Sequence, residues 1–392
     1  MLREGDFLKE LSENYQNFIY LVRAGLTGEK TDLSEEKINF SSVYELSVAH
    51  CITALVFAGI KNCSLALPRE IEKKFSSAEK VSAISSGARN DDAKKILSQL
   101  EKNNIDCMLL KGILFQEMYP QKHMRYSADI DFLIKNEDYK KCCSIIKNMG
   151  YFHDSKNDKH DVFTKKPFVC IEVHSRLSSG EDFFNNAWVN AEKIEKNIFR
   201  LKKEYELAYF IYHMKEDLTR SAGIGVHSLC DLWLYLKNYE KELDKEVLKS
   251  YLTELGIYKF FLSVTELCKI WFDNAETDEF YNELSEIIIS GNRGGNMINA
   301  ASLKIDGGKP LLLGKAGFLA KKIFLPYRDL KRIYPALGKF PPALPFFWGM
   351  RITGIIFRPE HRGFSRASQM LRYTDKERIN RIKGIFKELE ID

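Results

Sequence analysis

The sequence predicts an α+β fold, in which a small mixed-sheet domain is flanked by N-terminal and C-terminal helical segments. Apolar residues recur at helical spacing over residues 1–88 and 181–300, whereas residues 89–180 alternate short apolar runs with amphipathic stretches. The α-β-α-β-α-β-β order of that middle region is typical of a small domain with a mixed sheet. A fourth region, 301–392, stands apart because seven of the ten prolines follow residue 309.

The middle region, 89–180, carries the predicted sheet. We expect helices over residues 91–106, 113–119 and 136–150. We expect strands over residues 107–110, 129–134, 160–166 and 168–177. Lys111–Gly112 forms a turn after the first strand, Asn136 is the candidate N-cap of the third helix, and Gly150 ends that helix.

The two flanking segments are predicted to consist of packed helices. In the N-terminal segment, residues 43–60 have helical spacing and are too long for one strand. That segment holds no Gly-rich loop and no charge cluster, so we interpret it as a packing module. Behind the sheet domain, amphipathic helices over 205–218 and 225–243 are expected to cover its cleft.

Composition is that of an ordinary soluble globular protein, with 45% hydrophobic and 29% charged residues. The eight cysteines are scattered without a C-x-x-C pair, which argues against a zinc site or a disulfide framework and favours reduced thiols. The N-terminus is charged and lacks an apolar core, so no signal peptide is expected. We therefore expect a cytoplasmic protein, either free or peripheral at the inner face of the membrane.

The C-terminal region is basic. Residues 309–392 hold 18 Lys and Arg against 7 Asp and Glu, whereas the preceding residues carry net negative charge. Its prolines exclude one long helix. Three interpretations stay open: a solvated extension that docks on a protein partner, attachment to an anionic membrane surface through Phe346, Phe347 and Trp348, and contact with nucleic acid, for which no motif is present.

The stretch RYSADIDFLI, residues 125–134, places two carboxylates inside a β-prone run. Side chains at i and i+2 of a strand point to one face, so Asp129 and Asp131 face together. Without a cation they would repel each other, and a bound divalent ion removes that penalty. Mg²⁺ suits such a site, because it takes one or two carboxylates together with substrate phosphates.

A third carboxylate comes from VCIEVHS, where Glu172 lies between two apolar residues of the last expected strand. If that strand lies beside the Asp129–Asp131 strand, Glu172 joins the cluster. Three carboxylates can hold two Mg²⁺ ions, the arrangement that stabilises the attacking and leaving oxygens of a phosphoryl-type displacement. The alternative is a strand residue that faces solvent.

The candidate phosphate contacts precede this strand. In LLKGILFQ, the turn at Lys111–Gly112 offers backbone N–H groups, and Gly112 allows close approach. Arg125 supplies a planar fork for phosphate, or pairs with an aspartate. Ser127 is a further nucleotide-binding candidate, although its hydroxyl also suits a backbone cap.

Together, LLKG, MYP, RYSADIDFLI and VCIEVH resemble the nucleotidyltransferase superfamily, which has the DNA polymerase beta-like fold. The closest resemblance is to the bacterial family of uncharacterised nucleotidyltransferases, over roughly residues 90–235. A nucleotidyltransferase-like toxin group is also similar. The resemblance implies that Asp129 and Asp131 are the metal pair, that Glu172 completes the site and helps to deprotonate the acceptor, and that Gly112 lies under the triphosphate.

Two positions depart from the pattern of that superfamily. Ile113 stands where a second Gly or Ser is usual, which leaves backbone amides and Lys111 to contact phosphate. Glu172 stands where this family more often has Asp, and its longer arm still allows metal contact.

The implied reaction is the Mg²⁺-dependent transfer of an NMP group from an NTP, ATP or another, to a hydroxyl acceptor with release of pyrophosphate. One alternative is a toxin-like enzyme of the same chemistry that acts on RNA or protein. Another is an inactive copy of the fold that serves as a binding module. The acceptor is not encoded in any recognisable motif.

Four further residues have two interpretations each. His174 lies on the same strand face as Glu172 and either touches substrate or metal or is a hydrogen-bonded structural histidine. His213 and Lys215 are candidate substrate contacts on a helix over the cleft. Asp231 and His213 are either site residues on the helices over the cleft or a buried polar pair or cap.

Overall fold

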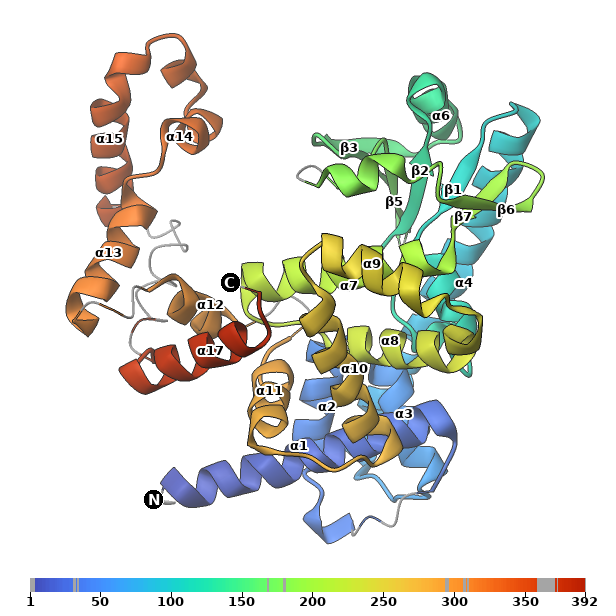
Figure 1. Cartoon of the computed structure of the whole chain (residues 1–392), viewed down its shortest axis with the longest axis vertical. Helices are drawn as coiled ribbons and strands as arrows, with labels where there is room; N and C mark the ends of the chain where they lie inside the picture. Colours follow the sequence, from blue (N-terminus) through green and yellow to red (C-terminus); the bar gives the residue numbers. More distant parts are fainter. Residues whose placement is uncertain are drawn as a thin grey trace. The chain divides into compact units, whose positions relative to one another are not determined.

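The computed structural model describes residues 4–30, 33, 35–167, 169–178, 181–292, 296–305, 308, 310–357, 371 and 373–391. The chain divides into two compact units. Unit 1 comprises Met1–Glu216 and Ile224–Arg293, and unit 2 comprises Asp217–Gly223 and Gly294–Asp392. The predicted α+β class is confirmed, because a mixed sheet and many helices make up unit 1 (Figure 1).

The described residues of unit 1 form a seven-stranded sheet with the order β3-β4-β5-β2-β1-β7-β6. The strands are β1 (Cys107–Leu109), β2 (Ile130–Ile134), β3 (Phe152–Lys156), β4 (His160–Lys165), β5 (Val169–His174), β6 (Ala191–Glu195) and β7 (Ile198–Leu201). The β2–β5 and β1–β7 pairs are parallel, and the other neighbours are antiparallel.

Alternation along β2 sends side chains to two different faces of the sheet. Ile130, Phe132 and Ile134 are fully buried on one face, among residues of α4 (Arg69–Lys102) and α6 (Asn136–Asn148). Leu133 points to the other face, where α7 (Lys203–Ser221) supplies Tyr205 and Tyr209. Asp131 shares the face of Leu133, because side chains two residues apart point the same way. The second face therefore combines an apolar part under α7 with the acidic part of β2.

Further helices, which precede, separate or follow the strands along the chain, complete unit 1. They are α1 (Glu4–Thr27), α2 (Phe40–Ala49), α3 (Thr53–Asn62), α5 (Lys111–Phe115), α8 (Val226–Tyr239), α9 (Lys245–Glu254), α10 (Tyr258–Asp273) and α11 (Glu279–Ile289). Helices α1 and α3 approach so closely that a Cβ at Gly59 would lie 1.9 Å from the carbonyl oxygen of Leu21. Buried His50 ties the two ends of the unit together, since its ring contacts Ile289 O at 3.0 Å and Val226 N at 3.2 Å.

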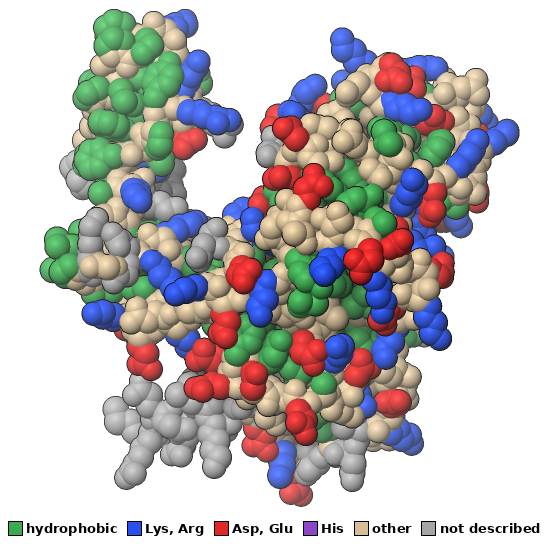
Figure 2. Space-filling model, in the orientation of Figure 1, with side chains coloured by type: hydrophobic (Ala, Val, Ile, Leu, Met, Phe, Trp, Pro, Cys, Tyr) green, Lys and Arg blue, Asp and Glu red, His purple; other side chains and the backbone are tan. Residues whose placement is uncertain are grey.

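Unit 2 is helical in its described part, with α12 (Met297–Lys304), α13 (Leu311–Ile323), α14 (Tyr327–Ile333), α15 (Leu344–Phe357) and α17 (Lys376–Glu388). Its core contains Ala301, Ile305, Phe318, Leu371 and Ile379. The prolines divide the region into short helices, as predicted, with Pro326 directly before α14. Figure 2 shows hydrophobic side chains gathered over the segment of α13–α15, with Lys and Arg beside them. None of the described helices is long and apolar enough to cross a membrane.

Short 3₁₀ helices are η1 (Glu35–Lys37), η2 (Gln116–Met118), η3 (Lys122–Met124), η4 (Asp182–Asn186), η5 (Glu240–Glu242), η6 (Pro335–Gly338) and η7 (Pro341–Ala343). The expected helix over 113–119 is thus α5 followed by η2. Helix α4 runs across the boundary expected at residues 88 and 89. Asn136 is not the N-cap of α6, because Lys135 holds that position without a side-chain bond. Gly150, at φ +85°, follows the end of α6 as predicted.

Candidate active site

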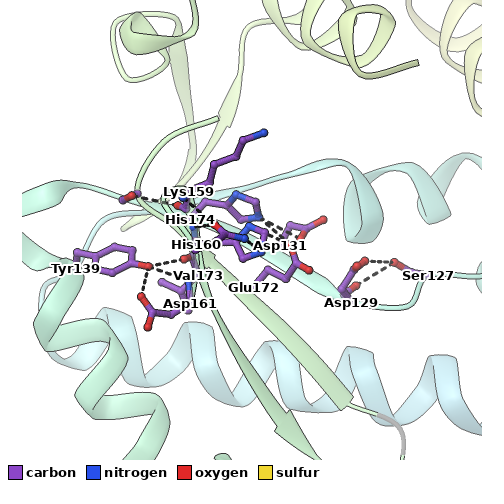
Figure 3. Close-up of polar contacts among 12 residues, drawn as sticks. Ser127, Asp129, Asp131, Tyr139, Lys159, His160, Asp161, Glu172, Val173 and His174 are labelled. Atoms are coloured by element: carbon purple, nitrogen blue, oxygen red, sulfur yellow. Dashed lines mark hydrogen bonds and ion pairs between the residues drawn. The ribbon is translucent and has the colours of Figure 1, made fainter. Parts of the chain in front are cut away.

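Three carboxylates meet where β2 begins. The parallel register of β2 and β5 sets Asp131 beside Glu172, so the two side chains emerge on one face. Asp129 lies one residue before β2, and Ser127 Oγ donates to its backbone oxygen at 2.9 Å. One carboxylate oxygen from each of Asp129, Asp131 and Glu172 lies within 4.8 Å of the others. The structure therefore brings together the three acids that the sequence selected (Figure 3).

Two histidines adjoin the acids. His174 follows Glu172 by two residues on β5, and its Nε2 lies 3.4 Å from Asp131 Oδ1 and 3.3 Å from Glu172 Oε2. His160 of β4 is paired directly opposite His174, and its Nδ1 lies 3.4 Å from Glu172 Oε2. Figure 3 shows both rings directed towards Glu172. His174 thus adjoins the acids, its contact with substrate or metal stays a prediction, and His160 was not selected from the sequence.

The charges in this group shift one another's pKa. Burial lowers the pKa of His174, but Asp131 and then Glu172 outweigh it and raise the pKa to about 9. Burial would raise the pKa of Asp131, but His174, followed by Lys111 and His213, lowers it overall. His160 has a lowered pKa, chiefly because of burial. In the metal-free protein, a protonated His174 thus balances part of the negative charge.

Gly112 supports the segment that carries Asp129. A Cβ at residue 112 would lie 2.8 Å from Ser127 Oγ and 3.5 Å from Asp129 O. Lys111 and Gly112, expected as a turn, are instead the first two residues of α5, and a side chain at residue 112 would displace the Ser127 hydroxyl. Ser127 has the backbone contact that was its alternative interpretation, and a direct contact of either residue with a nucleotide stays a prediction.

Arg125 pairs with an aspartate, which was the alternative to its expected contact with phosphate. Its Nε and Nη2 donate to the two oxygens of Asp231 in α8 at 2.8 and 2.7 Å, and Nη1 donates to Gly112 O at 3.3 Å. Tyr119 donates to Asp231 Oδ1 at 2.8 Å, and the side chains of the ion pair are 8% and 1% exposed. This geometry does not support the nucleotide-binding role expected of Arg125. The pair instead fixes α8 against the start of α5.

Lys111 and His213 approach the acids from opposite elements. Both lower the pKa of Asp131, so both lie within electrostatic range of it. Lys111 Nζ lies 4.7 Å from the ring centre of Tyr209 in α7, and His213 follows Tyr209 by one helical turn. Lys215 lies further along α7, with Nζ 5.8 Å from the ring centre of Tyr212. Helix α7 thus borders the site, as the sequence predicted.

The comparison with known families decides what kind of protein carries this site. Residues 36–273, more than half of the chain, match the model of the family described as uncharacterised nucleotidyltransferase. The chain belongs to this nucleotidyltransferase family. The assignment confirms the resemblance and supports a nucleotidyltransferase activity. No curated protein and no solved structure matches the chain.

The matched range of the nucleotidyltransferase family contains the whole site, from Gly112 to Asp231. Its three carboxylates fit Mg²⁺, because oxygen donors gathered within 4.8 Å are what a hard divalent ion binds. The nucleotidyltransferase has a further basic residue that the sequence did not single out. Arg89 of α4 is 6% exposed, and its guanidinium lies 5.6 Å from the ring centre of Tyr126. Burial lowers the pKa of Arg89, and the nearby negative charge of Asp129 opposes this shift.

Proposed function

We propose that this nucleotidyltransferase moves an NMP group from an NTP to a hydroxyl acceptor, with Mg²⁺ held by Asp129, Asp131 and Glu172. The observation that carries the proposal is the convergence of three carboxylates on one face of the sheet, where β2 begins, within a chain of this family. Three carboxylates can supply ligands to two Mg²⁺ ions, so the proposal includes two ions rather than one.

In the proposed reaction, the acceptor oxygen bonds to the α-phosphorus while the bond to the bridging oxygen of the β-phosphate breaks. Pyrophosphate carries away the electron pair of that bond, and the acceptor proton passes to a carboxylate oxygen of Glu172. When bound, Mg²⁺ neutralises charge on the phosphates and orients them.

The side chains of the protein have separate tasks in this scheme. Lys111, the first residue of α5, supplies a positive charge to the phosphates. His213 and Lys215, on α7, are proposed contacts for the substrates. Most of the rate enhancement comes from positioning and charge neutralisation.

The test uses each α-³²P-labelled NTP with purified protein, Mg²⁺ and cell extract. We expect a labelled product with wild type and none with the Asp129→Asn, Asp131→Asn double variant. In a parallel reaction with γ-³²P-labelled NTP, the same product should carry no label. A labelled small molecule supports the leading proposal, and labelled RNA or protein indicates the toxin-like alternative. Growth arrest on expression, lost in the double variant, would point the same way. Absence of any labelled product would favour an inactive binding module and contradict the proposal.

A further inference from the structure

A second group of candidate metal ligands lies beside the three carboxylates. His160, Glu172 and His174 each offer one ligand atom, and these atoms lie within 4.8 Å of one another. Two of the three donors are imidazole nitrogens, whereas the Asp129, Asp131 and Glu172 group offers only oxygen. Imidazole nitrogen suits zinc and neighbouring first-row transition metals, and carboxylate oxygen suits Mg²⁺.

The ring nitrogens that line this group lack hydrogen bonds. Nδ1 of His160 and both ring nitrogens of His174 are buried without a hydrogen-bond partner among the described residues. His174 is 8% exposed, and its contacts with Asp131 and Glu172 are at ion-pair distance. A buried polar atom that is left unpaired destabilises the fold. A ligand that satisfied these nitrogens would remove that destabilisation.

Regular structure holds the two rings in place. His160 and His174 are directly paired across β4 and β5, with ring centres 4.6 Å apart. Behind them, Tyr139 donates to Val173 O at 2.8 Å and to Asp161 Oδ2 at 2.7 Å, which anchors both strands to α6 (Figure 3). Ligands carried on paired strands are better fixed than ligands on loops.

We propose that His160, Glu172 and His174 form a binding site for a divalent transition-metal ion of the zinc class, with a coordination position left open. Two imidazoles and one carboxylate are a donor set of catalytic zinc sites, whose remaining position holds water or substrate. Each imidazole binds the ion through a lone pair, so the metal competes with protons for these nitrogens. The inference does not depend on NMP transfer, because only Glu172 is common to the two groups.

Co²⁺ serves as the probe, since its d–d absorption reports binding directly. Titration of the full chain is expected to show Co²⁺ binding that Zn²⁺ displaces and that Mg²⁺ competes with only weakly, through the shared Glu172. His160→Gln and His174→Gln should each weaken Co²⁺ binding by more than about 100-fold, since loss of an outer partner alone costs 10–100-fold. Asp129→Asn is the matched control, because Asp129 belongs only to the carboxylate group, and it should leave Co²⁺ affinity within about threefold.

Asn157 offers a variant that acts in the opposite direction. Its Nδ2 lies 2.9 Å from His160 Nε2, while its Oδ1 accepts from the backbone of Lys159 and His160 at 2.7 and 2.9 Å. The amide N–H favours a lone pair on Nε2 and so opposes a metal at Nδ1. Asn157→Asp keeps the backbone bonds and presents an acceptor to Nε2–H, so Co²⁺ should bind about tenfold more tightly.

Three results would overturn the metal proposal: no Co²⁺ binding, unchanged binding in both histidine variants, or equal losses in Asp129→Asn and His174→Gln. If the histidine variants do not fold, X-ray absorption of the Zn²⁺-loaded wild-type protein decides the question. Two imidazole ligands are expected, and a spectrum with none contradicts the site.

A different surface, on unit 2, carries an independent inference. Seven apolar side chains of residues 310–357 are each at least 43% exposed: Leu312, Leu313, Phe324, Ile333, Phe340, Phe346 and Met350. The same residues include eight Lys and Arg against one acid, Asp329. Exposed apolar side chains gathered on one segment mark an interaction surface, and the basic charge specifies an anionic partner.

We infer that the α13–α15 segment lies on an anionic membrane surface, with its apolar side chains inserted at the interface. Basic residues near such a surface are attracted to its anionic lipids, and inserted apolar side chains add to the binding. Of the three interpretations left open by the sequence, this one uses both the exposed apolar residues and the charge. Nucleic acid would use the charge and leave Leu312 and Phe346 exposed.

Vesicle flotation tests the surface with the full chain. We expect binding to phosphatidylcholine vesicles that contain phosphatidylglycerol, weakened by salt, and not to phosphatidylcholine alone. Leu312→Asp with Phe346→Asp should abolish flotation, whereas Val81→Asp, at an exposed apolar position of unit 1, should leave it unchanged. No flotation, flotation unaffected by the double substitution, or equal binding to neutral vesicles would overturn the inference. Tight RNA binding in its place would assign the charge to nucleic acid.

Discussion

Substitution of Asp231 by Asn should cost unit 1 a large part of its stability. Asp231 receives two hydrogen bonds from Arg125 and one from Tyr119, and its side chain is 1% exposed. The substitution leaves the Arg125 guanidinium buried without a counter-charge, which costs about 3–5 kcal/mol. Arg125 also donates to Gly112 O, so NTP-dependent activity should fall with stability.

Urea unfolding followed by tryptophan fluorescence measures this loss. In a Trp348→Phe background the remaining tryptophans, at 188, 233 and 271, all lie in unit 1. The control is Glu79→Gln, which breaks the Lys61–Glu79 pair, whose side chains are 50% and 27% exposed. That exposed pair should contribute less than about 1 kcal/mol.

A double substitution gives the sharper test. Arg125→Met with Asp231→Leu removes both charges, and its cost should be well below that of Asp231→Asn alone, because no uncompensated charge stays buried. A loss below about 1 kcal/mol for Asp231→Asn, or a double variant that is less stable than the single one, would refute the reasoning.

Three further outcomes can be measured on single variants. Gly112→Ala should lower NMP transfer by moving the Asp129 segment, and Ser127→Ala should partly restore it by removing the hydroxyl 2.8 Å from the new Cβ; no rescue would place the clash elsewhere. Lys111→Gln should raise the KM for NTP by about 10–100-fold, the value of a charge-assisted bond, while an unchanged KM would exclude a phosphate contact. Burial raises the pKa of Asp92, but the Tyr151 hydrogen bond at 2.7 Å helps to lower it overall. The ionised Asp92 therefore stabilises the folded protein above the ordinary Asp pKa of about 3.9. This stabilisation is lost as the pH falls through the lower pKa of Asp92 in the folded protein. The urea stability difference between wild type and Asp92→Asn should therefore narrow below about pH 4, and a constant difference would contradict this.

Much of the site could be predicted from the sequence because its signals are local. The apolar alternation of residues 130–134 specifies a strand and places Asp131 on one face, and the second β-run sets Glu172 on a neighbouring strand. The three strands that were missed lack this alternation: β3 is exposed throughout, β6 is exposed except at its first residue, and β7 is buried only at its last residue. Edge strands without a buried face leave no periodic pattern to detect.

Non-local pairing explains what the sequence could not settle. His160 reaches the site only because the β4–β5 register sets it opposite His174, and register is fixed by packing that single-sequence patterns do not specify. Arg125 and Asp231 are 106 residues apart, so the partner of the guanidinium could not be chosen between phosphate and carboxylate. The acceptor stays a prediction, since no motif in the sequence specifies it.

The most direct test of the central claim is the Mg²⁺-dependence of NTP binding. Calorimetry with a non-hydrolysable α,β-methylene NTP compares wild type with the Asp129→Asn, Asp131→Asn double variant, with and without Mg²⁺. If the carboxylates hold the metal, wild-type affinity falls when Mg²⁺ is removed, and the double variant binds weakly in both conditions. If the double variant keeps the Mg²⁺ and NTP affinity of wild type, Asp129 and Asp131 do not form the metal site.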